Sequence, residues 1–160
     1  MKKKDGTEKK DRSIRPAVLF VLIFLLATAI AISIPLYRHR QYVKFTSELS
    51  SLTSRAGRKG VVTCLMEGEE YRLSQEASYQ IYGKIIFMEM KKHVRPNAEL
   101  AADGMELTYG LLGGTLILAP AEYDGEEALY VEFHSNDMDY VYLAPQLRYK
   151  DFKELVTGGV

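Results

Sequence analysis

The longest apolar run in the chain covers residues 17–36, and its twenty residues include no charged side chain. An α-helix of this length rises about 30 Å, which matches the hydrocarbon thickness of a bilayer. The hydroxyls of Thr28 and Ser33 can bond to a carbonyl one helical turn earlier, so neither residue requires a functional role. The pattern predicts a transmembrane signal-anchor helix over residues 16–37, with the lipid bilayer as its partner.

Apolar positions then recur at helical spacing through residues 38–59, which predicts a basic helical stalk. These positions are Tyr42, Phe45, Leu49, Leu52 and Ala56. Two heptads are too few to argue a coiled coil. Three arrangements remain open: the stalk packs against its own domain, forms a weak parallel homodimer, or lies on the membrane surface. Gly57 and Gly60 are expected to end the helix and begin a linker.

A second helix is expected from Ser74, a suitable N-cap, to Pro96. Its predicted core-facing stripe is Tyr79, Tyr82, Gly83, Ile86, Phe87 and Met90, widened by Ile81, Ile85 and Met88. Its C-terminal dipole would be complemented by Lys91, Lys92 and His93. A shorter helix is expected after Pro145 and before Gly158-Gly159, with one apolar side formed by Leu147, Phe152, Leu155 and Val156.

Alternating apolar and polar positions predict strands at 61–66, 105–109, 115–119, 128–134 and 139–143. In the first strand, Val62, Cys64 and Met66 share one side. The loop 135–138 sets His134 opposite Asp139, with Leu129, Val131, Phe133, Tyr140 and Tyr142 on one face of the hairpin. The fold class is therefore α+β: an N-terminal transmembrane helix and stalk, then a small domain with an antiparallel β-sheet covered by one long and one short helix.

Charge divides the chain into zones, although the 160 residues have no net charge overall. Residues 1–15 carry seven basic and three acidic residues, and residues 38–59 carry six and one. Residues 60–160 carry eight basic and seventeen acidic residues, a net charge of −9. Because seven basic residues precede the apolar helix and three follow it closely, we expect a basic cytoplasmic tail at 1–15 and an acidic extracytoplasmic domain at 60–160. A domain of this charge disfavours nucleic acid as a partner.

A cleaved secretory signal peptide is the rival interpretation of the N-terminal region, because the small residues at 27–31 follow the strongly apolar stretch 17–26. The run continues through Ile30, Ile32 and Ile34, beyond the usual length of a signal peptide, which favours the uncleaved anchor. Both interpretations place residues 38–160 outside the cytoplasm. A mature N-terminus near Ile32 or Ile34 would identify a secreted small domain instead.

Candidate chemistry is sparse. Cys64 is the single cysteine, and its strand position predicts a buried apolar role rather than a reactive thiol. The residue types of a hydrolase triad occur together at His134, Ser135, Asp137 and Asp139, but a cross-strand pair of His134 with Asp139 explains them better.

Two acidic groups offer carboxylates of the kind that bind Ca²⁺: Asp137 with Asp139, and Glu122, Asp124, Glu126 and Glu127. Neither has the spacing of a calcium loop, and acidic turn tips commonly serve solubility. The nine tyrosines between Tyr71 and Tyr149 are expected mainly in the core, with a carbohydrate or peptide surface as the alternative. We therefore assign no catalytic, cofactor-binding or metal-binding residues and expect no cofactor.

The segment Ala29-Ile-Ala-Ile-Ser-Ile-Pro35-Leu-Tyr37, between a basic leader and an amphipathic stalk, resembles the N-terminal helix of type IV pilins and pseudopilins over about 30 residues. Aligned on Pro35, this chain has Ser13 where the family's peptidase motif has glycine, and Val18 where the family has its docking glutamate. The resemblance implies an assembly subunit of a surface filament.

The sequence as a whole predicts a single-pass membrane protein of bacterial type. Its extracytoplasmic domain is expected to serve as a non-catalytic binding or accessory module for a protein partner at the membrane surface. Pilin-like assembly is the first alternative, and a secreted small domain is the second.

Overall fold

A computed structural model describes residues 11–59, 62–87 and 92–158 of the chain. Helix α1 (Asp11–Lys59) runs without interruption through the predicted apolar helix and stalk. The side chains of residues 16–40 are exposed, and α1 is the one helix in the described ranges that is long and apolar enough to cross a membrane. The chain divides into two compact units, residues 1–40 and 41–160, so the last part of α1 belongs to the second unit.

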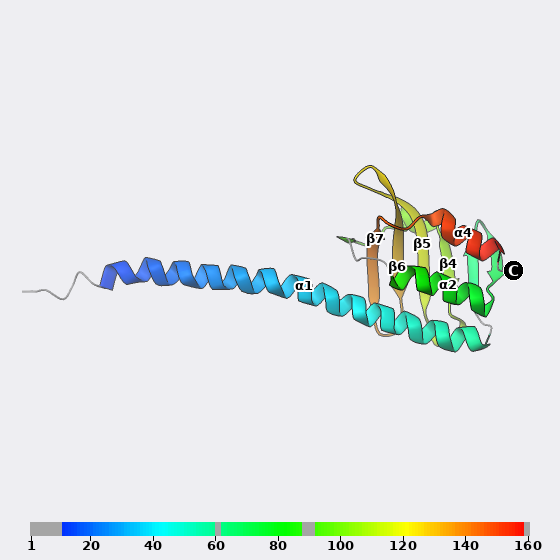
Figure 1. Cartoon of the computed structure of the whole chain (residues 1–160), viewed down its shortest axis with the longest axis horizontal. Coiled ribbons are helices and arrows are strands. Elements are labelled where there is room, and N and C mark those ends of the chain that lie inside the picture. The colour runs from blue at the N-terminus through cyan, green and yellow to red at the C-terminus, as the bar shows by residue number, and fades with distance from the viewer. Residues whose placement is uncertain (1–10, 60–61, 88–91, 159–160) are drawn as a thin grey trace, which may run out of the picture. The chain divides into compact units, whose positions relative to one another are not determined.

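The second unit is built on one antiparallel sheet with the strand order β2-β1-β4-β5-β6-β7-β3 (Figure 1). The strands are β1 (Thr63–Met66), β2 (Glu69–Arg72), β3 (Lys92–His93), β4 (Met105–Thr108), β5 (Thr115–Tyr123), β6 (Glu126–His134) and β7 (Asp139–Ala144). The helices are α2 (Gln75–Ile86), α3 (Ala98–Ala102), the 3-10 turn η1 (Gly110–Leu112) and α4 (Tyr149–Gly158). The predicted α+β class and the antiparallel sheet are confirmed.

Strands β4 to β7 form a meander, and β1 and β2 extend it as a hairpin. Two of the hairpins turn on two residues with positive φ: Glu67-Gly68 at 55° and 82°, and Asp124-Gly125 at 53° and 81°. Both central residues of a type I′ turn need this left-handed conformation, which favours glycine at the second position. In the β6–β7 hairpin, His134 lies opposite Asp139 and Phe133 lies opposite Tyr140, as the sequence predicts.

The main core lies between one face of the sheet and the helices α1, α2 and α4. The sheet contributes Cys64, Leu107, Leu118, Val131 and Phe133, all fully buried. The C-terminal part of α1 contributes Phe45, Leu49, Leu52 and Ala56; α2 contributes Ile81 and Ile85; α4 contributes Phe152 and Val156. The apolar positions of the predicted stalk are therefore core positions of the second unit. Of the three arrangements left open by the sequence, the stalk adopts the one in which it packs against its own domain.

The opposite face of the sheet is covered in part by α3. A small buried cluster forms there from Ala119, Tyr130 and Val141, with Leu100 and Ala101 of α3 packed against it. Away from α3 this face carries polar and exposed side chains, which are Thr63, Leu65, Glu106, Thr108, Thr115 and Asp139. We call it the polar face.

The interpretation of residues 74–96 as one helix is wrong beyond Ile86. Ser74 is the N-cap of α2, with its hydroxyl accepting from the Ala77 amide, but the helix ends at Ile86, and Lys92 and His93 form the edge strand β3 rather than a helix terminus. Pro96 therefore ends no helix. Met88, Met90 and Lys91 lie outside the described residues.

The predicted stripe of α2 is confirmed at Ile81 and Ile85, which are buried, and wrong at Tyr79 and Phe87. The buried residues are Ala77, Ser78, Ile81 and Ile85, whereas Tyr79 is partly exposed and Phe87 is almost fully exposed. The last helix agrees with its prediction, since Phe152 and Val156 are buried and Leu147 and Leu155 pack against the core.

Candidate functional site

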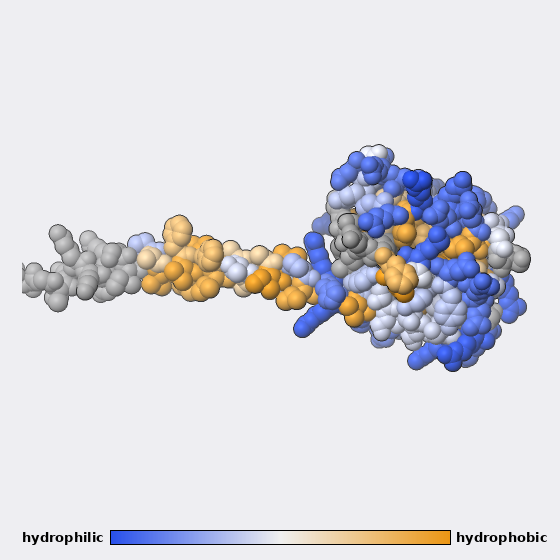
Figure 2. All heavy atoms as spheres, in the orientation of Figure 1, coloured by the Kyte–Doolittle hydropathy of each residue, from blue (hydrophilic) through white to orange (hydrophobic). Residues whose placement is uncertain are grey.

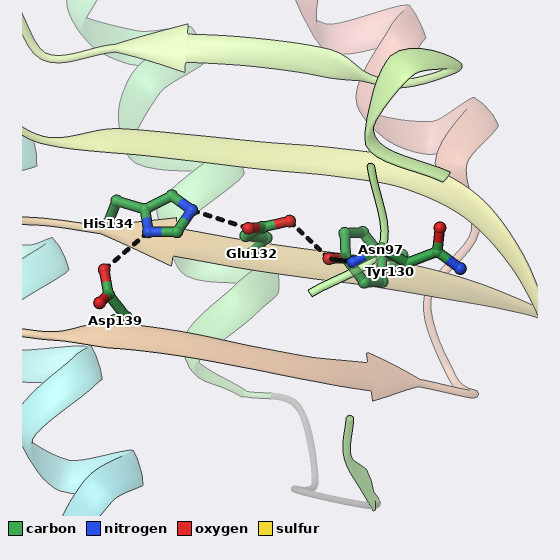
Figure 3. A network of polar contacts seen from close by, with 5 residues as sticks. All are labelled: Asn97, Tyr130, Glu132, His134 and Asp139. Atoms are coloured by element: carbon green, nitrogen blue, oxygen red, sulfur yellow. Dashed lines mark hydrogen bonds and ion pairs between the residues drawn. The ribbon is translucent and has the colours of Figure 1, made fainter. Parts of the chain in front are cut away.

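The most extensive polar arrangement in the described residues lies on the polar face of β6. Tyr130, Glu132 and His134 alternate along this strand and point to the same side, away from Val131 and Phe133 in the core. Cross-strand pairing places Asp139 beside His134 on β7. The four side chains therefore form a row, which Figure 3 shows continuing to Asn97.

Direct hydrogen bonds connect the row from end to end. His134 Nδ1 lies 2.7 Å from Asp139 Oδ1, and His134 Nε2 lies 2.7 Å from Glu132 Oε1. The Tyr130 hydroxyl donates to Glu132 Oε2 and accepts from the backbone N–H of Asn97 at 2.9 Å. Asn97 is also the N-cap of α3, because its side-chain oxygen accepts from the Glu99 and Leu100 amides. We call these five residues the His134 network.

Both imidazole nitrogens of His134 face a carboxylate oxygen, so both must donate if both carboxylates are ionised. That requirement favours the imidazolium form. Burial, the largest single effect, lowers the pKa of His134, but the hydrogen bonds to Asp139 and Glu132 together outweigh it and raise the pKa above 6.5. A histidine in this state has no free nitrogen lone pair with which to accept a proton or bind a metal ion.

Glu132 is 7% exposed and occupies the middle of the network, between Ile117 and Val141 on the adjacent strands. A buried carboxylate needs partners, and Glu132 has one neutral and one cationic donor. Burial and the hydrogen bond to Glu132 raise the pKa of Tyr130 to about 12, so its hydroxyl stays protonated at physiological pH. These contacts hold the side chains of Tyr130, Glu132 and His134 in fixed orientations on the polar face.

Ser135 and Asp137, which with His134 and Asp139 supply the residue types of a hydrolase triad, are held by other contacts. Ser135 Oγ accepts from the Asp137 amide at 3.2 Å within the β6–β7 loop, and the Asp137 carbonyl accepts from Lys44 of α1 at 2.8 Å. The contact predicted between His134 and Asp139 is confirmed. Sequence reasoning missed Glu132 and Tyr130, although the two-residue spacing of Tyr130, Glu132 and His134 along one strand is the signal that could identify them.

Cys64 is buried, as predicted. Burial, with a smaller contribution from Glu106, raises the pKa of its thiol to about 12. A thiol with this pKa is a poor nucleophile, because the reactive form is the thiolate. Cys64 therefore serves as a small apolar residue of the core.

The acidic residues at the tip of the β5–β6 hairpin follow the strand register. Glu122 lies opposite Glu127, Tyr123 lies opposite Glu126, and Asp124 occupies the turn. Glu127 comes within 3.9 Å of Arg148. Across the described ranges no group of three or more His, Cys, Asp and Glu side chains is arranged to hold a metal ion.

The nine tyrosines lie mostly in or against the core. Tyr109, Tyr130, Tyr140 and Tyr142 are buried, Tyr71, Tyr82, Tyr123 and Tyr149 are half-buried, and Tyr79 is partly exposed. This distribution agrees with the prediction of a mainly structural role.

Comparison with protein family models, with curated proteins and with solved structures finds no match for this chain.

Proposed function

We propose that the chain is a single-pass membrane protein that presents an acidic, non-catalytic binding domain at the outer surface of the membrane. One observation carries the proposal: α1 is a single helix whose apolar side chains are exposed over residues 17–36 and whose later residues enter the core. Exposed apolar side chains around a whole helix are expected only where lipid or protein surrounds it. The anchor would therefore be structurally continuous with the domain that it holds.

The direction of insertion is proposed from charge. Seven basic residues precede the apolar helix and three follow it within fifteen residues, which favours a cytoplasmic N-terminus. Limited proteolysis of sealed cells tests this direction. Residues 60–160 should be cleaved from outside, and an epitope in residues 1–15 should stay protected until the cells are lysed.

Binding is favoured over catalysis by the His134 network. A catalytic histidine needs one ring nitrogen available to the reacting group, and here a carboxylate faces each nitrogen. Retention near the membrane raises the effective concentration of the domain for partners at that surface. The net charge of −9 in residues 60–160 favours a cationic partner by long-range attraction.

Salt dependence tests the binding proposal. Crosslinking in native membranes would first identify the partner. Its uncrosslinked association with the chain should then weaken as the ionic strength rises. Neutralising Glu122, Glu126 and Glu127 together to Gln should weaken it as well. A second triple variant, Glu67→Gln with Glu69→Gln and Glu70→Gln, removes the same charge elsewhere and should act similarly if the field, rather than one contact, attracts the partner. Partner binding that changes neither with ionic strength nor in the two triple variants would contradict the proposal.

Pilin-like assembly is the second candidate, and one observation favours it. The later part of α1 packs on an antiparallel sheet while its apolar part is exposed, an arrangement that fits the resemblance to pilins in residues 29–37. It predicts cleavage after Ser13 and surface filaments that shear from cells. Mass spectrometry of the mature N-terminus separates this candidate from the uncleaved anchor and from a secreted domain that begins near Ile32.

A further inference from the structure

Phe87 is the least covered large hydrophobic residue in the second unit. It is 87% exposed, more than any other large apolar side chain described in residues 41–158. It directly follows α2 as the C-cap, and its amide donates to the Ile85 carbonyl, so its backbone is held by the helix. Figure 2 shows apolar atoms at the surface of the domain where α2 ends in Figure 1.

The position of Phe87 is tied to the start of the domain. The Tyr42 hydroxyl donates a 2.7 Å hydrogen bond to the carbonyl of Ile86, the residue before Phe87. Tyr42 lies six residues after Leu36, the last residue of the apolar run. Six residues span at most about 20 Å even when fully extended. The corner formed by Tyr42, Ile86 and Phe87 therefore cannot move far from the end of the apolar segment, whatever the angle between the two units.

The residues that follow the apolar run along the chain suit the boundary between lipid and water. Val43 is 50% exposed, Tyr37 is 64% exposed, and Arg38 and Arg40 lie between the apolar run and Tyr42. Aromatic side chains are enriched at membrane interfaces, and arginines there attract anionic headgroups. Polar headgroups add about 5–7 Å to each side of the hydrocarbon layer. This layer lies within the maximum distance of about 20 Å that separates Tyr42 from Leu36.

We propose that Phe87 lies in the headgroup region of the same membrane that holds α1, and that it acts as a second, peripheral contact of the domain with lipid. This inference rests on the proposed membrane anchor. It commits to lipid as the occupant because the chain itself limits how far this corner can lie from the apolar segment. A second copy of the chain covering Phe87 is the competing outcome.

The chain contains no tryptophan, so one substitution introduces a single fluorescent reporter. We would compare full-length Phe87→Trp, Tyr79→Trp and Leu26→Trp in vesicles of phosphatidylcholine and phosphatidylglycerol, with and without a mixture of lipids brominated near the headgroup end and near the methyl end of their acyl chains, because Leu26 lies at the middle of the apolar run. Tyr79 is the matched control, because it lies on α2 eight residues before Phe87 and is 37% exposed. Leu26 reports the apolar segment itself.

We expect bromine to quench Leu26→Trp and Phe87→Trp, with a blue-shifted emission of Phe87→Trp, and to leave Tyr79→Trp unchanged. If Leu26→Trp is quenched but Phe87→Trp is not, the anchor stands and the contact is refuted. A blue shift of Phe87→Trp without quenching would mean that protein covers this residue, which also refutes the contact. Equal quenching of Tyr79→Trp and Phe87→Trp would refute a contact specific to this corner. If neither Leu26→Trp nor Phe87→Trp is quenched, both the anchor and the contact fail.

Discussion

Phe45 of α1 stacks on Tyr140 of β7, with ring centroids 4.7 Å apart and ring planes inclined by 11°. Phe45 also meets Phe133 and Tyr142 edge to face, at 5.3 and 5.6 Å. The helix that carries the apolar segment is thus joined to the sheet by an aromatic cluster.

Replacing Phe45 with alanine should therefore destabilise the domain strongly. Loss of a fully buried phenylalanine costs about 3–5 kcal/mol in unfolding free energy. The control is Val43→Ala, because Val43 lies two residues away on α1 and is 50% exposed. That change should stay within about 0.5 kcal/mol. Denaturant unfolding of the full chain in lipid nanodiscs measures both, and equal effects would contradict the packing of α1.

Two buried tyrosines should respond in opposite ways to loss of the hydroxyl. Tyr130→Phe leaves Glu132 without one of its donors and the Asn97 amide without its acceptor, which should cost about 1–3 kcal/mol. The Tyr142 hydroxyl is buried and has no hydrogen-bond partner among the described residues. Tyr142→Phe should therefore leave the free energy of unfolding unchanged or raise it. A larger loss for Tyr142→Phe than for Tyr130→Phe would refute this assignment.

Stability should depend on the protonation of His134. Its pKa is raised in the folded chain, so its contribution is complete below the unfolded value of about 6.5 and is lost as the pH rises through the folded value. Unfolding free energy should thus fall as the pH rises above about 6.5, and His134→Gln should reduce that fall. An NMR titration should place the folded pKa above 6.5. A midpoint below that value would contradict the network.

Cys64 should resist modification while the chain is folded. Its thiol is buried and its pKa is raised to about 12, so little thiolate is present near neutral pH. A thiol-specific chromogenic reagent should react slowly with the native protein and stoichiometrically after denaturation. Rapid reaction of the native protein would show that β1 opens or that Cys64 is accessible.

The features that sequence reasoning predicted are those with strong local signals. The pairing of His134 with Asp139 followed from a short loop between two alternating strands, and Ser74 is a residue type that begins helices. The end of α2 was missed because Phe87 continued the helical spacing of apolar residues, although tertiary packing leaves it exposed. The strand β3 has two residues and is defined by its pairing with β7, so no local sequence pattern predicts it.

The His134 network was only half predicted for a related reason. Its cross-strand contact follows from register, but the burial of Glu132 depends on Ile117 and Val141, which pairing brings from β5 and β7. The link to Asn97 depends on α3, a five-residue helix whose position is set by packing on the sheet. Contacts between elements that are distant in sequence decide the rest of the network.

Membrane orientation is the central claim, and labelling of single cysteines tests it most directly. In a Cys64→Ala background, one cysteine would be placed at Glu126 on the exposed β5–β6 hairpin or at Lys4 near the N-terminus. Intact cells would then be treated with a membrane-impermeant maleimide. The account predicts labelling of Glu126→Cys in intact cells and of Lys4→Cys only after lysis. Labelling of Lys4→Cys in intact cells, with Glu126→Cys protected, would contradict it.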